Sequence, residues 1–453
     1  MFSVAEIVQA TQGLLVQGSL MDKITNIVTD SRCLKPHEAF LAIRGKNFDG
    51  HDFISKSIKA KASCIIIDRK IKILVPENLA VVKVKDTVLA LGDLAHFQRQ
   101  KFNLPVIAVT GSNGKTTTKE MISWVLSADA RVLKNEGTKN NQIGVPQTLM
   151  QLTLKDNFAV VEMGTNHFGE IDYLSKIAMP NLGIITNIGP SHLEFLKNLK
   201  GVAKEKVTLL DNLAKPAIAL LNADDKILNS LINRLSNHQQ IFSFGVNKKS
   251  DFCASEIKLK NKGLEFVVNS KFKFELTTLG QYNIYNALAA IAVGRFCGLS
   301  YALMRSRLAK FKFPKGRLNF IELKGLRFID DTYNSNPLSL RAAVVALGAA
   351  SCKGRRILIM ADMLELGKQK ELLHRQIAWS ITNNCDLLIA VGSLARITAK
   401  SAKEHGLPDK HIFCCANALE AREILFKKVF PQADDLILVK GSRSMKMEEV
   451  LGN

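Results

Sequence analysis

The stretch from Val109 to Lys119 holds the residues best suited to chemistry, and it reads V-T-G-S-N-G-K-T-T-T-K. Gly111 and Gly114 allow the backbone to turn its N–H groups inward around an anion. Lys115 can reach the outer phosphates of a nucleotide, and the Thr116 hydroxyl can hold a magnesium ion. Such a loop usually has glycine six residues before its lysine, where this chain has valine. The sequence predicts a loop that binds the phosphates of a nucleoside triphosphate.

The segments on either side of this loop supply a strand and a helix. Residues 106–109 are all apolar, which predicts a buried strand, and residues 115–128 read as a helix. A polyphosphate would lie at the N-terminus of that helix, where unpaired amides and the macrodipole favour an anion. A glycine-rich turn before an ordinary helix is the alternative. Glycine-lysine-threonine with both flanks in place favours the phosphate site.

Polar residues also follow two later apolar runs. Glu162 ends the run at 158–161, and His192 follows the run at 183–188. Ligands of open α/β sheets bind beyond the carboxyl ends of the strands, so both residues are candidates for the site. Mg²⁺ prefers oxygen ligands to imidazole. From the residues alone, Glu162 is the better magnesium ligand and His192 reads as a solvated loop histidine.

Four further polar stretches lie at turns or within a helix. Residues 330–337, D-D-T-Y-N-S-N-P, have the composition of a fixed turn after a strand. Residues 440–443 follow a strand and are predicted to open a helix, which makes them a candidate second anion site. Asn283, in a helix predicted at 279–298, is either a helix cap or a ligand contact. The loop at 29–32 is a candidate binding loop.

Composition places the chain among multidomain α/β proteins. At 453 residues, with 47% apolar and only 7% aromatic residues, it is too long for one core and suits parallel sheets. No apolar run approaches the ~18 residues of a membrane span, and the first ten residues do not resemble a signal peptide. The eight cysteines include no C-x-x-C pair, which favours buried thiols in a reducing compartment. We therefore expect a cytoplasmic protein.

The formal charge of +21 raises the question of nucleic acid binding. The basic residues are spread along the chain, however, and no aromatic residues alternate with them as in strips that stack bases. A solvated basic surface with a site for anionic substrates is the better interpretation.

The order of strands and helices predicts three domains. Residues 1–84 read as a small α/β domain, with strands at 24–29, 39–43, 64–67 and 79–84 and a helix near 52–61. Residues 85–313 start with a helix at 87–100 and form a parallel-sheet domain, with a hairpin at 264–276. Residues 314–453 repeat the alternation of strand and helix, with strands at 356–360, 386–391 and 436–439, and read as a doubly wound, Rossmann-like domain.

Several motifs together resemble one family in their order and spacing. They are T-G-S-N-G-K-T-T-T, E-M-G-T-N-H-F-G-E-I, T-N-I-G-P-S-H-L-E, N-A-D-D, G-R-L, D-D-T-Y-N-S-N-P and D-M-L-E-L-G. These look like the Mur ligases of bacterial cell-wall synthesis, and the match runs from about Asp30 to Met445. The resemblance implies a UDP-substrate-binding domain, a central P-loop domain for ATP and a C-terminal ligase domain.

Three stretches, at 135–146, 162–171 and 362–367, point to one branch of that family. They resemble the ligases that join D-alanyl-D-alanine to UDP-N-acetylmuramoyl-tripeptide, using ATP and Mg²⁺ and an acyl phosphate. The D-N-P-R motif of the sister enzymes that add a diamino acid does not occur in this sequence. The resemblance thus implies these two substrates, no nucleic acid, and a monomer.

The resemblance also assigns roles to individual residues. It gives magnesium ligation to Thr116, Glu162, His192 and Lys206, the last as a carbamylated lysine, and catalysis to Lys115 with Glu162, His192 and Lys206. It places the nucleotide against Gly111, Ser112, Asn113, Gly114, Lys115, Thr116, Thr117, Asn283, Arg317, Asp330 and Asn334. It assigns the other substrates to Ser31, Arg32, Gly45, Asn140, Asn141, Asn166, His167 and Asn336. After Lys206 the chain has valine and threonine where the family has glycine and glutamate.

Two other kinds of enzyme remain open at this stage. One is a related amide ligase, either the diamino-acid-adding Mur enzyme or a folylpolyglutamate-type synthetase. The other is a P-loop ATPase that acts on nucleic acid or a protein partner, which the charge favours. Two observations argue against such an ATPase. The Asp-Glu pair that commonly ends a strand in motor ATPases does not occur here, and the sequence has no arginine-rich or aromatic strip.

Overall fold

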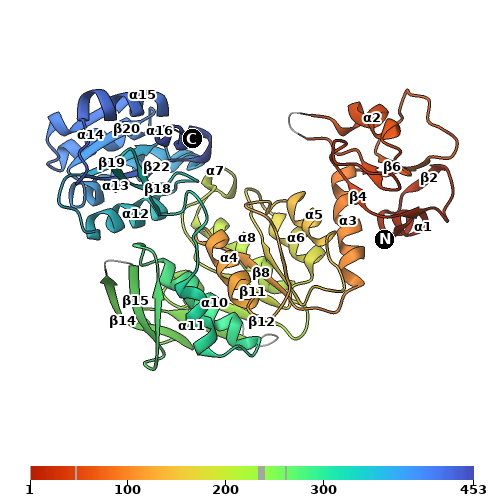
Figure 1. Ribbon diagram of the computed structural model, residues 1–453, viewed down its shortest axis with the longest axis horizontal. Coiled ribbons are helices and arrows are strands. Elements are labelled where there is room, and N and C mark those ends of the chain that lie inside the picture. The colour runs from red at the N-terminus through yellow and green to blue at the C-terminus, as the bar shows by residue number, and fades with distance from the viewer. Residues whose placement is uncertain (1, 46–47, 233–239, 261–262, 453) are drawn as a thin grey trace.

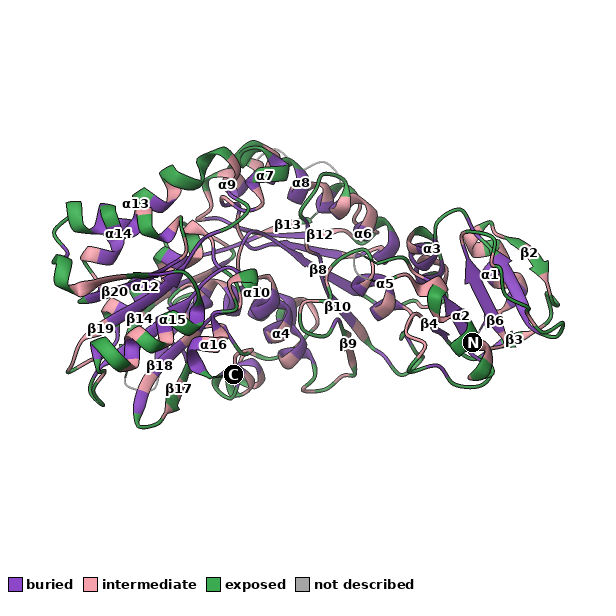
Figure 2. Ribbon diagram, turned by 90° about the horizontal axis from the view of Figure 1, so that it is seen from above, coloured by how far each residue is buried: buried purple, intermediate pink, exposed green. Residues whose placement is uncertain are grey.

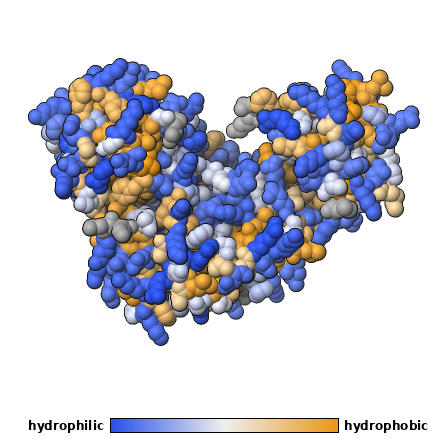
Figure 3. Space-filling view, in the orientation of Figure 1, coloured by the Kyte–Doolittle hydropathy of each residue, from blue (hydrophilic) through white to orange (hydrophobic). Residues whose placement is uncertain are grey.

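The chain forms three lobes, seen in a computed structural model that describes residues 2–45, 48–232, 240–260 and 263–452. In Figure 1 the N-terminal lobe is red to orange, the central lobe runs from orange through yellow to green, and the C-terminal lobe is blue. The N- and C-terminal lobes stand on either side of the central one, and the surface is hollowed between them (Figure 3). Each lobe is built on its own sheet.

The N-terminal lobe has a five-stranded sheet of order β2-β7-β6-β5-β4. Only β2 is antiparallel to its neighbour. The bounds are β2 Leu14–Gln17, β4 Ile27–Val28, β5 Ala39–Leu41, β6 Cys64–Ile67, β7 Ala80–Lys83, α1 Val4–Thr11 and α2 Ile54–Lys59. The single strand predicted at 24–29 is wrong. It is two short strands, because β3 (Lys23–Ile24) pairs with β1 (Phe2–Ser3) in a separate sheet while β4 joins the main one.

The central lobe has a nine-stranded sheet of order β16-β15-β14-β13-β12-β11-β8-β10-β9. The strands from β9 to β14 pair in parallel, whereas β14, β15 and β16 pair antiparallel. Their bounds are β8 Val106–Thr110, β9 Val132–Lys134, β10 Phe158–Glu162, β11 Leu182–Ile185, β12 Ile218–Asn222, β13 Gln240–Gly245, β14 Phe252–Lys260, β15 Gly263–Val268 and β16 Phe272–Leu276. The last two strands confirm the predicted hairpin.

Helices cover both faces of this sheet, which explains the continuous apolar runs of its strands. Within β8, Ile107 and Val109 pack toward α4 and α10, whereas Val106 and Ala108 pack toward α5 and α6. The helices of the lobe are α3 Thr87–Gln100, α4 Lys115–Leu126, α5 Gly144–Leu149, α6 Glu170–Ala178, α7 Leu193–Leu196, α8 Leu199–Asp211, α9 Lys226–Ile232, α10 Asn283–Phe296 and α11 Tyr301–Ala309. The predicted helix at 87–100 is confirmed, and α10 starts four residues after the predicted position.

The C-terminal lobe has a six-stranded sheet of order β17-β18-β22-β19-β20-β21, antiparallel only at β17. Its strands are β17 Asn319–Leu323, β18 Leu326–Asp331, β19 Arg356–Ala361, β20 Leu387–Val391, β21 Ile412–Cys415 and β22 Leu436–Lys440. Its helices are α12 Pro337–Ala349, α13 Lys370–Thr382, α14 Ala395–Glu404, α15 Ala418–Ile424 and α16 Glu448–Leu451. The first three helices cover one face and the last two cover the other. The buried strands between them stand out in Figure 2, and the doubly wound fold is confirmed.

Candidate active site

The predicted phosphate loop connects β8 to α4 and requires both of its glycines. Gly111 has a φ of +146° and Gly114 a φ of +81°, backbone conformations that side chains disfavour. Space is also lacking, because a Cβ on Gly111 would lie 1.9 Å from the Thr186 hydroxyl oxygen and one on Gly114 would lie 2.5 Å from the side-chain oxygen of Asn286. The loop therefore packs tightly against the residues that follow β11 and against α10.

Hydrogen bonds from the segment after β11 hold the loop in place. The Ser112 amide donates to the Asn187 carbonyl and the Asn113 amide to the Asn187 side-chain oxygen, both over 2.9 Å. The Ser112 hydroxyl donates to the Gly189 carbonyl over 2.9 Å, and the Thr186 hydroxyl donates to the Asn113 carbonyl over 2.5 Å. The loop is thus fixed before a nucleotide binds, which suits a preorganised anion site.

Lys115 is half-buried and folded back onto the loop. Its Nζ donates to the Gly111 carbonyl over 2.8 Å. Burial lowers the pKa of Lys115, an effect that nearby Glu162 opposes and Arg317 reinforces. Among the described residues Lys115 has no carboxylate within ion-pair distance, so its charge is available to an anionic ligand. The next two residues of α4, Thr116 and Thr117, are buried.

Glu162 ends β10, beside the end of β8, with which it pairs in register at Val109. The side chain is 1% exposed, and its Oε1 accepts a hydrogen bond from Asn140 Nδ2 over 2.7 Å. Its Oε2 is buried and has no hydrogen-bond partner among the described residues. An unpartnered buried carboxylate oxygen is costly unless a cation or a donor completes it. This oxygen therefore fits the magnesium role expected of Glu162.

His192 is paired with the C-terminal lobe. Its Nδ1 lies 2.6 Å from Oε2 of Glu365, and its backbone is left-handed, with a φ of +53°. The parts of the chain that the structure describes hold no group of three or more His, Cys, Asp or Glu side chains arranged around a metal position. The ligand set of Glu162 with His192 therefore stays a prediction.

Lys206 lies on α8 and is only 1% exposed. No hydrogen bond or ion pair of its amine is found within the described residues. Burial lowers the pKa of Lys206 well below its ordinary value, Lys115 lowers it further, and Glu205 acts in the opposite direction. The Glu205 carboxylate itself accepts the amides of Gly169 and Ile171, each over 2.8 Å. Lys206 is thus a buried amine beside the phosphate loop without a partner of its own.

Asn283 on α10 supports the phosphate loop through Asn286, which lies against Gly114. Its side chain is 2% exposed, donates to the Thr278 hydroxyl over 3.1 Å and accepts from Asn286 over 2.9 Å. Asn286 in turn accepts the hydroxyl of Thr118 on α4 over 3.0 Å. The side-chain amides of Asn283 and Asn286 thus bond to other groups of the protein. The nucleotide contact expected of Asn283 stays a prediction.

Two C-terminal residues reach the phosphate loop. Arg317 donates to the Thr116 hydroxyl over 3.4 Å while its guanidinium stacks 3.9 Å above the Tyr333 ring. Asn336, the N-cap of α12, donates to the side-chain oxygen of Asn113 over 2.7 Å. The structure therefore brings the loop of the central lobe together with predicted residues from a part of the chain about 200 positions away.

Asp330 and Asn334 lie in the segment that leads to Asn336, and Asp330 also holds the turn before Arg317. The Asp330 carboxylate accepts the Gly316 amide over 3.1 Å and the Thr332 hydroxyl over 2.6 Å. Asn334 is exposed, and its side-chain oxygen accepts the amide of the following residue over 2.9 Å. Neither side chain contacts the phosphate loop among the hydrogen bonds of the described chain, so their nucleotide contacts stay predictions.

The helix predicted to open at 440–443 is wrong, and the second anion site expected there stays a prediction. Lys440 is 2% exposed, and its ammonium lies 2.5 Å from the buried carboxylate of Asp331. The lysine charge is therefore already neutralised. The residues after it form a single 3-10 turn, Arg443–Met445, in place of the helix that an anion site would need.

A cavity of about 520 Å³ opens between the loop after β9 and α5. It includes the predicted substrate residue Asn141, whose side chain caps α5 at the Gly144 amide over 2.9 Å. Gln147 also lines it and donates to the Thr29 hydroxyl of the N-terminal lobe over 2.7 Å. The lining residues are Glu136, Gly137, Thr138, Lys139, Asn141, Ile143, Gly144 and Gln147. The cavity thus lies where the first two lobes meet.

The remaining predicted substrate residues lie on surface loops of two lobes. Arg32 is exposed and pairs with Asp30 over 2.7 Å, and Arg32 lowers the pKa of that carboxyl to about 2. Ser31 is half-buried next to it, and the Gly45 amide donates to the carbonyl of Phe48 over 2.8 Å. Nothing in these contacts identifies a uridine pocket, so the substrate roles stay predictions.

Asn166 and His167 lie in the loop after β10. Both backbone amides donate to Oε2 of Glu170, over 2.6 Å and 3.1 Å. The His167 ring also lies 4.3 Å from the ring of Phe195 on α7. The loop is therefore ordered next to the site.

Sequence reasoning assigned no role to Lys119, Asn135 and Glu365, although all three lie in motifs that it singled out, and these residues connect the predicted ones to one another. Lys119 is fully buried and donates to the loop after β9, and Asn135 in that loop hydrogen bonds the backbone of Glu162. Lys119 lies one helical turn after Lys115, a spacing that could have suggested a second role on the same helix. No comparable local signal precedes Glu365.

No helix within the described residues is long and apolar enough to cross a membrane.

Comparison with known proteins matches the three lobes to profiles of one family. Residues 23–99 match its "Mur ligase family, catalytic domain", residues 109–294 its "Mur ligase middle domain" and residues 316–443 its "Mur ligase, glutamate ligase domain". An Escherichia coli (strain K12) protein named UDP-N-acetylmuramoyl-tripeptide–D-alanyl-D-alanine ligase is 37% identical over 94% of this chain and 92% of its own length.

Solved structures of similar proteins share this fold over almost the whole chain. A crystal structure of MurF from Acinetobacter baumannii has a TM-score of 0.91 at 33% identity, and covers 100% of this chain and 98% of that one. A MurF ligase from Thermotoga maritima, solved in complex with ADP, has a TM-score of 0.83 at 26% identity and covers 94% and 96% of the two chains. With the family's profiles matched in all three lobes and this similarity end to end, the chain belongs to the Mur ligase family.

Proposed function

We propose that this protein joins D-alanyl-D-alanine to UDP-N-acetylmuramoyl-tripeptide at the expense of ATP, which gives the pentapeptide precursor of peptidoglycan. The observation that carries this proposal is the identity of 37% over 94% of the chain to an enzyme named for that reaction. The site supports it, because a preorganised phosphate loop, a buried carboxylate at Glu162 and an arginine from another lobe meet at one place. These are the parts that phosphoryl transfer between two anions requires.

The chemistry follows from the weak electrophilicity of a carboxylate. The terminal carboxylate of the tripeptide attacks the γ-phosphorus of ATP, which forms an acyl phosphate and releases ADP. The free amine of D-alanyl-D-alanine then attacks the acyl carbon, an amide bond forms, and inorganic phosphate leaves with the electron pair of the broken C–O bond. The amine loses a proton in this second step.

The residues of the chain contribute charge and position to both steps. The amides of the phosphate loop and the α4 N-terminus hold the triphosphate. Lys115, which donates only to backbone carbonyls in this structure, can exchange them for phosphate oxygens. Arg317 adds a second positive charge from the C-terminal lobe when the lobes are together. Fixed charges of this kind stabilise charge that develops in the transition state.

Magnesium is part of the proposal, since the orphaned Oε2 of Glu162 fits a hard cation. We assign its protein ligands to Thr116, Glu162, His192 and a carbamylated Lys206. His192 would have to leave Glu365 to take part. When bound, Mg²⁺ supplies positive charge between the triphosphate and the incoming carboxylate.

The three domains divide the substrates among them in this proposal. We assign residues 1–84 to the uridine nucleotide, residues 85–313 to ATP, and residues 314–453 to the dipeptide. The cavity beside α5 lies on the path from the first domain to the phosphate loop, which suits the peptide arm of the nucleotide. We further propose that the enzyme works as a monomer.

The sister ligase that adds a diamino acid is the nearest alternative. Its D-N-P-R motif supplies an arginine for the carboxylate of a free amino acid, and this chain lacks that motif. A dipeptide with two methyl side chains needs a shallow apolar pocket and one carboxylate contact. The whole-length identities favour the dipeptide enzyme over a folate-type synthetase and over an ATPase acting on nucleic acid.

Release of ADP, measured with one component omitted at a time, tests the proposal. We expect release only when ATP, the tripeptide nucleotide and D-alanyl-D-alanine are all present, with D-alanine alone much poorer because it cannot fill the pocket and place its amine together. Release that DNA or RNA stimulates, without any dependence on the dipeptide, would contradict it.

A further inference from the structure

Lys119 is a fully buried lysine one helical turn after Lys115 on α4. Its side chain is 0% exposed. Its Nζ donates to the carbonyl of Asn135 over 2.6 Å and to that of Gly137 over 2.9 Å, and lies 2.9 Å from Oε1 of Glu120. All three of its donors are therefore used. Burying an ammonium costs much free energy unless its hydrogen bonds are satisfied in this way, and the satisfied arrangement has one geometry.

The loop that Lys119 holds also controls Glu162. The Asn135 side-chain oxygen accepts the Glu162 amide over 2.9 Å, and its nitrogen donates to the Glu162 carbonyl over 3.1 Å. Five residues later in the same loop, Asn140 donates to the Glu162 carboxylate over 2.7 Å. The backbone and the side chain of Glu162 are thus both fixed from a loop that is itself fixed by Lys119.

The opposite side of this loop lines the cavity of about 520 Å³. Gly137, whose carbonyl Lys119 holds, and Lys139 are both lining residues. The other wall is α5, where Gln147 reaches the Thr29 hydroxyl of the N-terminal lobe. A change in the loop would therefore alter the cavity and the Glu162 carboxylate together, while the phosphate loop keeps its own contacts to Asn187 and Gly189.

We propose that Lys119 is a positioning residue that ties the helix of the phosphate loop to the loop that receives the peptide arm of the nucleotide-linked acid. It does not touch the reacting atoms. It acts by holding the carbonyls of Asn135 and Gly137, and through them the cavity wall and Glu162. This inference rests on the proposed function, because it takes the tripeptide nucleotide as the ligand of the cavity.

Arg99 provides a matched control. It is also a buried cation, 7% exposed, and it donates to three backbone carbonyls: Ala178 over 3.0 Å, Phe102 over 2.5 Å and Leu104 over 3.1 Å. Two of these carbonyls precede β8 and the third is at the end of α6. They lie near the amino ends of the strands, whereas the phosphate loop lies at the carboxyl ends. Loss of Arg99 therefore costs similar buried hydrogen bonds without reaching the cavity.

The experiment compares Lys119→Met with Arg99→Met. The dissociation constant of UDP-N-acetylmuramoyl-tripeptide is measured by calorimetry without ATP, and the KM values of all three substrates are measured in the ligation assay. For Lys119→Met we expect the nucleotide to bind about tenfold or more weakly without ATP, as when other supporting contacts are removed, with a smaller change in the KM of ATP because the phosphate loop keeps its own contacts. For Arg99→Met we expect a lower melting temperature and unchanged ratios between these constants.

Gly137→Pro tests the same contact from the loop side in case Lys119→Met does not fold. Gly137 is exposed and has a φ of +52°, which proline cannot adopt, so the carbonyl must turn away from Lys119. We expect the same selective loss of nucleotide binding. A dissociation constant within about twofold of the original in the folded Lys119 variant, or in the Gly137 variant if only that one folds, would overturn the inference. If the original protein binds the nucleotide but does not ligate it, the proposed function fails while the binding comparison still decides the role of Lys119.

Discussion

Lys115 and Lys206 are two lysines at the site whose amines pair with no carboxylate among the described residues. Lys115 donates only to backbone carbonyls, and Lys206 has no hydrogen bond or ion pair among the described residues. A third buried lysine nearby, Lys119, shows the contrast, because its donors are all used. Lys115 at the end of the parallel sheet is therefore suited to bind an anion, whereas the buried amine of Lys206 is open to modification.

Lys115→Met should abolish turnover and leave the fold intact. The lysine is half-buried and donates to two backbone carbonyls, whereas its charge is needed where phosphoryl charge develops. Removing such a preorganised donor costs about 3 kcal/mol, or about a hundredfold or more in kcat. Steady-state turnover and thermal melts would be measured beside Lys176→Met, an exposed lysine on α6. An active Lys115 variant would refute the assignment of the ATP site.

Lys206 should carry a carbamate in the working enzyme. Carbon dioxide reacts with a neutral amine, and a buried amine without an acidic partner within bonding distance provides one. The product would present two hard oxygens to a cation. We expect a carbamate signal in ¹³C spectra of the protein incubated with labelled bicarbonate, and no such signal from Lys206→Met. Short carboxylates should partly restore activity to Lys206→Ala. A fully active, metal-loaded enzyme with unmodified Lys206 would contradict this prediction.

The residues of the phosphate loop could be predicted from sequence because their types and spacing are local. Gly111, Gly114 and Lys115 have the positions that the motif requires. The partners of Lys119 and Glu365 could not be found in this way, since the first depends on a loop 16 residues later and the second on a histidine 173 residues earlier. Partners so far apart are brought together by the packing of whole elements.

At the level of elements, the strands that end at the site are those buried on both faces. The predicted bounds of β6, β10 and α3 agree with the structure, because a continuous apolar run or a capped helix marks both of their ends. The split of residues 24–28 between two sheets was not predictable, since it depends on pairing with β1 at the start of the chain. Pairing choices of this kind are not written in local periodicity.

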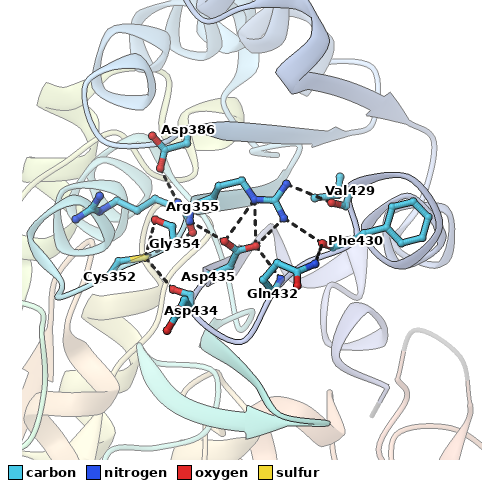
Figure 4. Close-up of polar contacts among 10 residues, drawn as sticks. Cys352, Gly354, Arg355, Asp386, Val429, Phe430, Gln432, Asp434 and Asp435 are labelled. Atoms are coloured by element: carbon cyan, nitrogen blue, oxygen red, sulfur yellow. Dashed lines mark hydrogen bonds and ion pairs between the residues drawn. The ribbon is translucent and has the colours of Figure 1, made fainter.

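A cluster of hydrogen bonds between Arg355 and Asp435 lies at the amino ends of β19 and β22, away from the site (Figure 4). Asp435, just before β22, accepts the Arg355 backbone amide over 2.6 Å and its guanidinium over 2.7 Å. Arg355 also donates to the carbonyls of Val429 and Phe430. These hydrogen bonds fix the chain between α15 and β22 to the start of β19. Burial acts to raise the pKa of Asp435, but the bonds from Gln432 and Arg355 outweigh it and the pKa is lowered.

Asp435→Asn should therefore destabilise the protein by about 2 kcal/mol at neutral pH, through the loss of charged hydrogen bonds. In the unfolded chain the pKa of Asp435 is about 4, and in the folded protein it is lower. The stabilisation that its charge provides is therefore complete above about pH 5 and is lost as the pH falls through the folded pKa. The difference in melting temperature between the original protein and the variant should stay constant above about pH 5 and shrink as the pH falls further. Asp434→Asn, at an exposed neighbour, is the control. A difference that does not change with pH would show that the Asp435 charge is not responsible.

At the scale of the whole molecule, the site is complete only when the central and C-terminal lobes are together. Arg317 reaches Thr116, Asn336 reaches Asn113, and His192 pairs with Glu365. Separate lobes for separate substrates imply closure before reaction. The three-lobe plan could be predicted from sequence, but the contacts between lobes could not, because each joins residues far apart in the chain without a periodic pattern.

Arg317→Ala should lower kcat about a hundredfold with a smaller effect on the KM of ATP. The arginine lies on the C-terminal lobe and contacts Thr116 at the start of α4, so we expect it to favour the transition state over initial nucleotide binding. Arg327→Ala, on the same lobe but bonded to the Ser351 carbonyl, is the control. An unchanged kcat would separate Arg317 from the reaction.

We also propose domain boundaries at 84/85 and 313/314. The segment at 310–314 has no regular structure between α11 and the turn that carries Arg317. Limited proteolysis should therefore cut first near residue 313, and ATP together with the tripeptide nucleotide should slow this cut by holding the lobes closed. A first cut inside one of the three lobes would contradict these boundaries.

The identity of the product tests the central claim most directly. The purified protein would be incubated with ATP, Mg²⁺ and either UDP-N-acetylmuramoyl-tripeptide or the corresponding dipeptide nucleotide, with D-alanyl-D-alanine, lysine or diaminopimelate offered as the amine. Mass spectrometry would then identify the nucleotide formed. We predict a single product, the tripeptide nucleotide extended by D-alanyl-D-alanine. Extension of the dipeptide nucleotide by lysine or diaminopimelate, with the tripeptide nucleotide left unchanged, would contradict the proposed function.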